Sequence, residues 1–333
     1  MKTFLQPLQN LAEMEEIQKQ AKKNCGILEI SGCMESQKAH LMYGLSGLFP
    51  CHLIISEDER SAKQMYEDYR FYDKRVYYYP AKDLLFFQAD IHGNLLIRQR
   101  MQVIRALLER EDEITVVTSI DGCMDYLAPL EKIEKQLIYF RNDSTLDMDK
   151  LTAALVHMGY ERVGQVEMPG QFSIRGGIID IYSLTEENPW RIELWGDEID
   201  SIRSFDVESQ RSIEQVDEVT IDPAAEYIMS VSVRDRGLKL IDQDMKQQVQ
   251  RLKDAGNYEA AARLKQAVAE LKDNLELSSA ASGIDSLVQY FYDHTVSFLD
   301  YFTEKDSLII LDEPARVAEK GEAVTAEYRE SMM

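Results

Sequence analysis

Alternation of apolar and polar residues over residues 171–206, interrupted by tight-turn signals, constrains the fold of this chain more than any other feature. Successive side chains of a strand point to opposite faces of a sheet, so this alternation predicts short strands. Gly176-Gly177 and Gly196-Asp197 fit tight turns, because glycine adopts the positive φ angles that such turns require. The segment therefore predicts a small sheet with one buried face.

The two faces of this predicted sheet differ in composition. The face expected in the core carries Phe172, Ile174, Trp190, Ile192 and Leu194. The opposite face carries Arg175, Arg191 and Trp195, and a Trp grouped with two Arg has the composition of a protein-binding hot spot. The structural alternative is that Arg191 pairs with Glu193 or Asp197 and that Trp195 covers a sheet edge. The pattern alone leaves both interpretations open.

A strand-like run, a glycine-containing loop and a helix-like run follow one another in residues 25–49. This is the context of the phosphate-binding loop G-x-x-x-x-G-K-[ST]. Gly32 and Lys38 match its first glycine and its lysine. Gln37 replaces the second glycine, and Ala39 replaces the hydroxyl residue that binds Mg²⁺. The pattern predicts a nucleotide-binding fold whose site has degenerated, and the alternative is a working nucleotide site.

A second acidic motif lies near the end of the chain, where the apolar run SLIIL is followed by Asp312-Glu313. In a helicase, acids at the end of such a strand hold magnesium and polarise water. Without a competent phosphate-binding loop we interpret Asp312 and Glu313 as a second remnant of the same site. The alternative is an acidic strand end that meets solvent.

Helix and strand patterns suggest three parts. Strands alternate with helices in residues 1–125, which predicts a parallel α/β sheet. Residues 126–216 change to a small α+β domain of about ninety residues. Residues 217–333 return to the first domain and include a helical hairpin, predicted over residues 233–276 from apolar positions at helical spacing.

The net charge of −22 argues against strong binding to nucleic acid. Binding through phosphates needs clustered Lys and Arg, and here acidic residues dilute the basic ones nearly everywhere. The charge favours a protein partner. No run of eighteen apolar residues occurs, so no membrane span is expected. The cysteines lack C-x-x-C spacing, which predicts reduced thiols in the cytoplasm and no zinc site.

The runs MPGQFSIRGGIIDIYS, PWRIELWGDEIDSIRSFD and ESQRS closely resemble the amino-terminal region of the bacterial transcription-repair coupling factor (Mfd), a region itself similar to the excision-repair protein UvrB. The resemblance implies a parallel-sheet, helicase-like domain with a degenerate P-loop (UvrB domain 1-like) and an inserted α+β domain (UvrB domain 2-like) that docks UvrA. Arg175 and Arg191 match the family's interface positions in identity. Trp195 stands where family members often have Phe.

The resemblance also implies what this chain does and does not do. We expect a non-catalytic adaptor that docks UvrA, with no catalytic residue, cofactor or metal of its own. RNA polymerase, DNA, and ATP with Mg²⁺ would belong to other domains of a longer, translocating factor. The long aromatic hairpin with which UvrB probes damaged DNA is not expected, since only about twenty residues follow Tyr79 before the next helix. The alternatives are an ATP-binding helicase lobe and a DNA-binding module.

Overall fold

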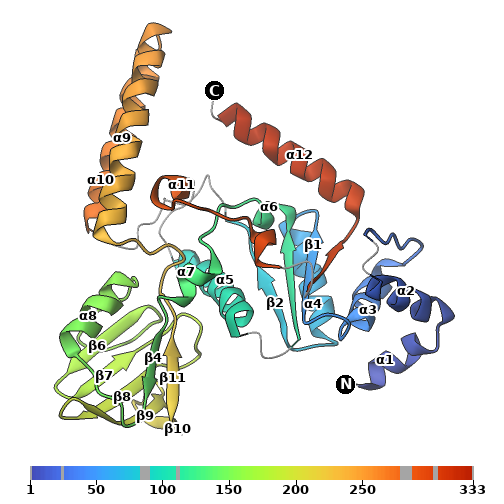
Figure 1. Cartoon of the computed structure of the whole chain (residues 1–333), viewed down its shortest axis with the longest axis horizontal. Coiled ribbons are helices and arrows are strands. Elements are labelled where there is room, and N and C mark those ends of the chain that lie inside the picture. The colour runs from blue at the N-terminus through green and yellow to red at the C-terminus, as the bar shows by residue number, and fades with distance from the viewer. Residues whose placement is uncertain are drawn as a thin grey trace. The chain divides into compact units, whose positions relative to one another are not determined.

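The computed structural model describes residues 2–23, 26–82, 91–109, 113–277, 287–302 and 307–331. The chain divides into two compact units (Figure 1). Unit 1 comprises residues 1–82, 102–125 and 297–333, and unit 2 comprises residues 83–101 and 126–296. Unit 2 is therefore inserted into unit 1 along the sequence. These boundaries follow spatial contacts, and the three-part division predicted above stays a prediction.

A four-stranded parallel sheet forms the centre of unit 1. Its strand order is β12-β1-β3-β2, and every neighbouring pair is parallel. The strands are β1 (Cys51–Ser56), β2 (Val76–Tyr79), β3 (Ile114–Ser119) and β12 (Ser307–Leu311). The middle strands β1 and β3 are buried along their whole length, as apolar strands covered on both faces are. The predicted α/β fold with a parallel sheet is confirmed.

Helices pack around this sheet, and the first three of them precede its strands in the sequence. They are α1 (Lys2–Gln9), α2 (Ala12–Lys22), α3 (Glu35–Leu45), α4 (Glu59–Arg70), α6 (Ile120–Cys123), the 3₁₀ helix η2 (Phe298–Tyr301) and α12 (Pro314–Ser331), while α5 (Ile91–Glu109) begins in unit 2 and ends in unit 1. Tyr43 of α3 and Tyr69 of α4 pack in one cluster with Ile54 of β1. Lys38 belongs to α3, so the packing of α3 in this cluster fixes the position of Lys38.

The strand predicted immediately before Gly32 is not formed. Residues 26–34 have no regular secondary structure, and the apolar side chains of Ile27, Leu28 and Ile30 are exposed. β propensity reflects packing on neighbouring strands and is a weak backbone preference by itself. This run has apolar composition but no strand beside it. The strand, loop and helix arrangement of a phosphate-binding loop is therefore incomplete.

His52, the second residue of β1, predicts a pH dependence of stability. The side chain is buried, and burial lowers its pKa below the ordinary value. The unfolded chain therefore binds this proton more readily. The contribution of neutral His52 to the free energy of unfolding should be fully present above about pH 6.5. As the pH falls below this value, the free energy of unfolding should decrease by up to about 1.4 kcal/mol per pH unit. Urea unfolding at pH 7.5 and at pH 5.5 measures this loss.

The His52→Leu variant should lose less stability than wild type between these two pH values. The exposed His294 provides the matched control, since His294→Leu also removes one histidine. An equal loss in wild type and His52→Leu would contradict the prediction.

Unit 2 contains a six-stranded sheet of order β10-β9-β8-β7-β6-β5 (Figure 1). Its strands are β5 (Glu161–Arg162), β6 (Gln171–Arg175), β7 (Ile178–Ile181), β8 (Trp190–Trp195), β9 (Glu198–Phe205) and β10 (Ser212–Val216). The β5–β6 pair is parallel, and the other pairs are antiparallel. Helix α8 (Met148–His157) covers one face, and β4 (Ile138–Arg141) pairs with β11 (Glu218–Ile221) beside the same core. A short helix, α7 (Leu130–Glu134), precedes β4.

The helical hairpin predicted from the sequence is present in unit 2. It consists of α9 (Val231–Asp254) and α10 (Tyr258–Leu277), which lie side by side (Figure 1). The turn contains Gly256, whose φ of +77° explains the break predicted at this position. At the base of the hairpin, α11 (Val288–Phe291) packs with both helices in one hydrophobic cluster.

Candidate functional site

The buried face of the six-stranded sheet is the one predicted. Phe172, Ile179 and Ile192 are fully buried in one core cluster, against which Ile174, Trp190 and Leu194 pack. The strand register aligns Ile174 with Ile179 and Ile179 with Ile192. Alternation then places Arg175, Arg191 and Trp195 on the opposite face of the sheet, which we call the outer face.

Both predicted turns shape the outer face. Gly176 and Gly196 adopt φ angles of +62° and +65° at two-residue turns between adjacent strands, the conformation that L side chains avoid. At Gly177 a Cβ would lie 3.0 Å from the carbonyl oxygen of Leu194. The Leu194 amide of β8 donates a hydrogen bond to the Gly177 carbonyl (2.8 Å). The turn between β6 and β7 is thus held against β8, which flanks β7 in the sheet.

The outer face brings Arg175, Arg191 and Trp195 together, each from the strand predicted for it. Trp195 is 84% exposed. The side chain of Arg175 is 45% exposed, whereas that of Arg191 is only 13% exposed. The trio therefore lies on one face, on which Trp195 and Arg175 are far more exposed than Arg191.

Asp180 of β7, which the sequence analysis did not single out, joins the two arginines. Arg175 donates from Nη2 to Asp180 Oδ2 (2.6 Å), and Arg191 donates from Nε to Oδ1 (2.7 Å) and from Nη2 to Oδ2 (2.9 Å). Asp180 is 1% exposed. The available sequence signal was a single Asp within the apolar run IIDI, since a buried charge needs a partner.

The alternative pairing considered for Arg191 is wrong. Arg191 bonds Asp180 and not Glu193 or Asp197, and Glu193 instead accepts from Arg203 of β9. Hydrogen bonding to Asp180 raises the pKa of Arg191 above its ordinary value. Its guanidinium also lies 4.2 Å from the centre of the Phe205 ring, a cation–π contact.

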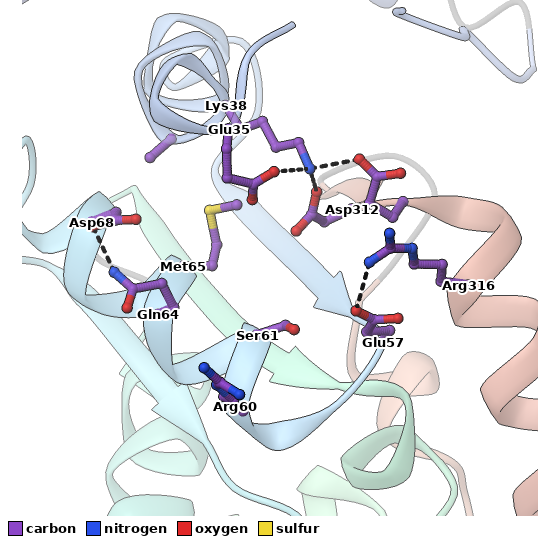
Figure 2. Close-up of a pocket in the computed structure, with 12 residues that line it drawn as sticks. Glu35, Lys38, Glu57, Arg60, Ser61, Gln64, Met65, Asp68, Asp312 and Arg316 are labelled. Atoms are coloured by element: carbon purple, nitrogen blue, oxygen red, sulfur yellow. Dashed lines mark hydrogen bonds and ion pairs between the residues drawn. The ribbon is translucent and has the colours of Figure 1, made fainter.

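The predicted nucleotide site lies in unit 1, where Figure 2 shows Lys38 reaching toward three carboxylates. Lys38 Nζ lies 2.9 Å from Asp312 Oδ1, 2.7 Å from Glu313 Oε1 and 2.9 Å from Glu35 Oε2. Burial alone would lower the pKa of Lys38, but the bonds to these acids raise it above the ordinary value. The charged ammonium is therefore favoured over the neutral amine, and it is already paired with the chain's own acids.

The remaining positions of the predicted loop make other contacts. Gly32 has a φ of +86° within the irregular run before α3. The Gln37 side chain accepts a hydrogen bond from the Met34 amide (3.3 Å), and Ala39 is buried in the core of unit 1. The structure thus brings Lys38, Asp312 and Glu313 together and leaves Gly32, Gln37 and Ala39 in other roles.

A pocket of about 330 Å³ adjoins Lys38. Its lining includes five acids and three bases: Glu35, Glu57, Asp68, Asp312, Glu313, Lys38, Arg60 and Arg316. Arg316 bonds Glu57 across the pocket (3.2 Å) (Figure 2). An acidic lining in which Lys38 and Arg316 are already paired with acids is unfavourable for a triphosphate. Within the described ranges no group of three or more His, Cys, Asp or Glu is arranged to hold a metal ion.

Comparisons with known proteins match the segment that contains the six-stranded sheet. Residues 138–227 match the family described as the UvrB interaction domain. A transcription-repair-coupling factor of Bacillus subtilis is 35% identical over 318 residues, which cover 90% of this chain and 26% of that protein. Those of Staphylococcus aureus MRSA252 and Staphylococcus epidermidis ATCC 12228 are each 31% identical, over 83% and 78% of this chain and 23% and 22% of theirs.

The resemblance to the amino-terminal module of the transcription-repair coupling factor is confirmed. The chain spans about a quarter of the length of the coupling factors it matches. The domain match begins with β4 and ends after β11, so it includes the outer face. Lys38 and its acids lie outside it. No helix among the described residues is long and apolar enough to cross a membrane.

Proposed function

We propose that this chain is the non-catalytic, UvrB-like part of a transcription-repair coupling factor and that its outer face docks UvrA. The observation that carries the proposal is an exposed Trp195 on the same sheet face as the half-exposed Arg175, within the matched interaction domain. When a partner covers this face, the indole would supply a desolvated anchor and the guanidinium a charge-assisted donor for a partner carboxylate. On this proposal unit 1 corresponds to UvrB domain 1, and the sheet of unit 2 to domain 2.

The rest of the factor supplies what this chain lacks. ATP with Mg²⁺, DNA and RNA polymerase would be bound by other domains in the cytoplasm, and this chain would recruit the excision machinery to stalled polymerase. The paired state of Lys38 supports a nucleotide site that no longer functions. The net charge of −22 speaks against a DNA-binding module.

Binding of UvrA to the purified chain tests the proposal. The Arg175→Ala/Arg191→Ala double variant should bind UvrA about 2 kcal/mol more weakly than wild type, because it removes both the exposed donor and its support. Isothermal titration calorimetry measures the difference, and a pull-down gives an independent comparison.

Two exposed arginines of the helical hairpin provide a matched control. Arg236→Ala/Arg263→Ala removes the same charge from residues outside the sheet and should keep wild-type affinity. Retention of UvrA by the Arg175/Arg191 double variant at the wild-type level would refute the proposal.

A further inference from the structure

The outer face contains a carboxylate that no partner could reach. Asp180 is 1% exposed, yet it receives three hydrogen bonds from two arginines, all between 2.6 and 2.9 Å. A buried carboxylate with two guanidinium groups is fixed in position by its own bonds. Its effect on a partner must therefore act through Arg175 and Arg191.

A second layer of contacts holds Arg191 behind Asp180. Arg191 Nη2 also donates to Gln210 Oε1 (2.9 Å). Gln210 has a left-handed φ of +58°. Its backbone N–H donates to the Asp206 carbonyl (2.8 Å) in the turn between β9 and β10. This turn thus presents a neutral acceptor to Arg191 and completes the support of the guanidinium.

Arg175 is the part of this network that reaches solvent. Its Nη2 donates to Asp180, and its Nε and Nη1 make no hydrogen bond to the described residues. An arginine side chain loses considerable rotamer freedom when a partner binds it. A side chain already fixed by Asp180 loses less, which favours binding through preorganisation.

We propose that Asp180 is a positioning residue of the docking face, which orients Arg175 toward a partner carboxylate with Arg191 and Gln210 as its supports. This inference rests on the proposed function and deepens it, because it assigns Arg191 a supporting role and Arg175 the direct contact. The partner group that fits is a carboxylate beside an apolar pocket that accepts the Trp195 indole.

Charge counting and positioning predict opposite effects of removing the Asp180 charge. Asp180→Asn makes the outer face more positive. If only net charge mattered, association with an acidic partner site would be faster and binding tighter. If Asp180 positions Arg175, the variant should instead bind about tenfold more weakly, mainly through faster dissociation.

Surface plasmon resonance with UvrA as the probe distinguishes the net-charge effect from the positioning effect. Glu214→Gln is the matched control, because it removes one negative charge from the same sheet at an exposed residue paired with Ser204 rather than with the arginines. It should keep the wild-type dissociation rate. In the Arg175→Ala background, Asp180→Asn should add less than about a twofold further loss, because its effect passes through Arg175.

Gln210→Asn keeps the proposal testable if Asp180→Asn fails to fold. Asn tolerates the left-handed conformation but is too short to reach Arg191, so dissociation should be about threefold faster with no change of charge. Wild-type or tighter binding by Asp180→Asn, or unchanged dissociation of Gln210→Asn, would overturn the inference while wild type still binds UvrA. Absence of UvrA binding by wild type would overturn the proposed function itself, and this inference with it.

Discussion

Replacing Trp195 with alanine is expected to weaken UvrA binding by about 3 kcal/mol and to change the free energy of unfolding by less than about 0.5 kcal/mol. The indole is 84% exposed at the end of β8, so it contributes little to the chain's own packing. Tryptophan at the centre of an interface is among the residues with the largest truncation effects. Calorimetric titration with UvrA and urea unfolding measure the two quantities separately.

Two variants sharpen the Trp195 experiment. Trp195→Phe should keep most of the affinity, because a benzyl group retains the aromatic anchor. Tyr139→Ala removes another exposed aromatic residue, from β4 rather than from the six-stranded sheet, and should leave UvrA binding unchanged. Wild-type affinity of Trp195→Ala would show that the indole is not an anchor.

Replacing Lys38 with alanine is expected to lower the free energy of unfolding by about 3 kcal/mol. The Lys38 side chain is 11% exposed and that of Asp312 is 9% exposed, and the lysine also balances Glu313 and Glu35. Without the ammonium, these three carboxylates would repel one another, and that of Asp312 would be buried without a counter-charge. Lys150→Ala removes a surface lysine paired with Asp147 and should cost less than about 1 kcal/mol.

The same variant decides the state of the nucleotide site. We expect no saturable micromolar binding of a fluorescent ATP analogue with Mg²⁺ to wild type, because its loop lysine is held by Asp312 and Glu313. Saturable binding that Lys38→Ala abolishes would favour the helicase-lobe alternative. Unchanged stability of Lys38→Ala would contradict the structural role assigned to this lysine.

A β-bulge in β9 illustrates a detail that alternation alone does not predict. The register pairs Glu193 with Ser201 but Leu194 with Ile199, so Asp200 is skipped. Ile199 and Ile202 are three residues apart, and regular alternation would place them on opposite faces. The bulge turns both into the core, where both are buried.

The sequence by itself determined the faces of the inserted sheet and its turns. Alternation with period two and glycine at positive φ are local properties, so Phe172, Trp195 and Gly196 could be placed without a structure. The strand expected before Gly32 failed because its formation depends on a neighbouring strand and not on its own composition.

Only the tertiary structure decided how the charged groups are paired. Asp180 meets Arg191 through strand register, and Lys38 meets Asp312 across most of the length of the chain. Each carboxylate had many possible partners in the sequence. Packing fixes one set of ion pairs because it buries each acid beside its cation, and a buried charge is stable only with a partner in place.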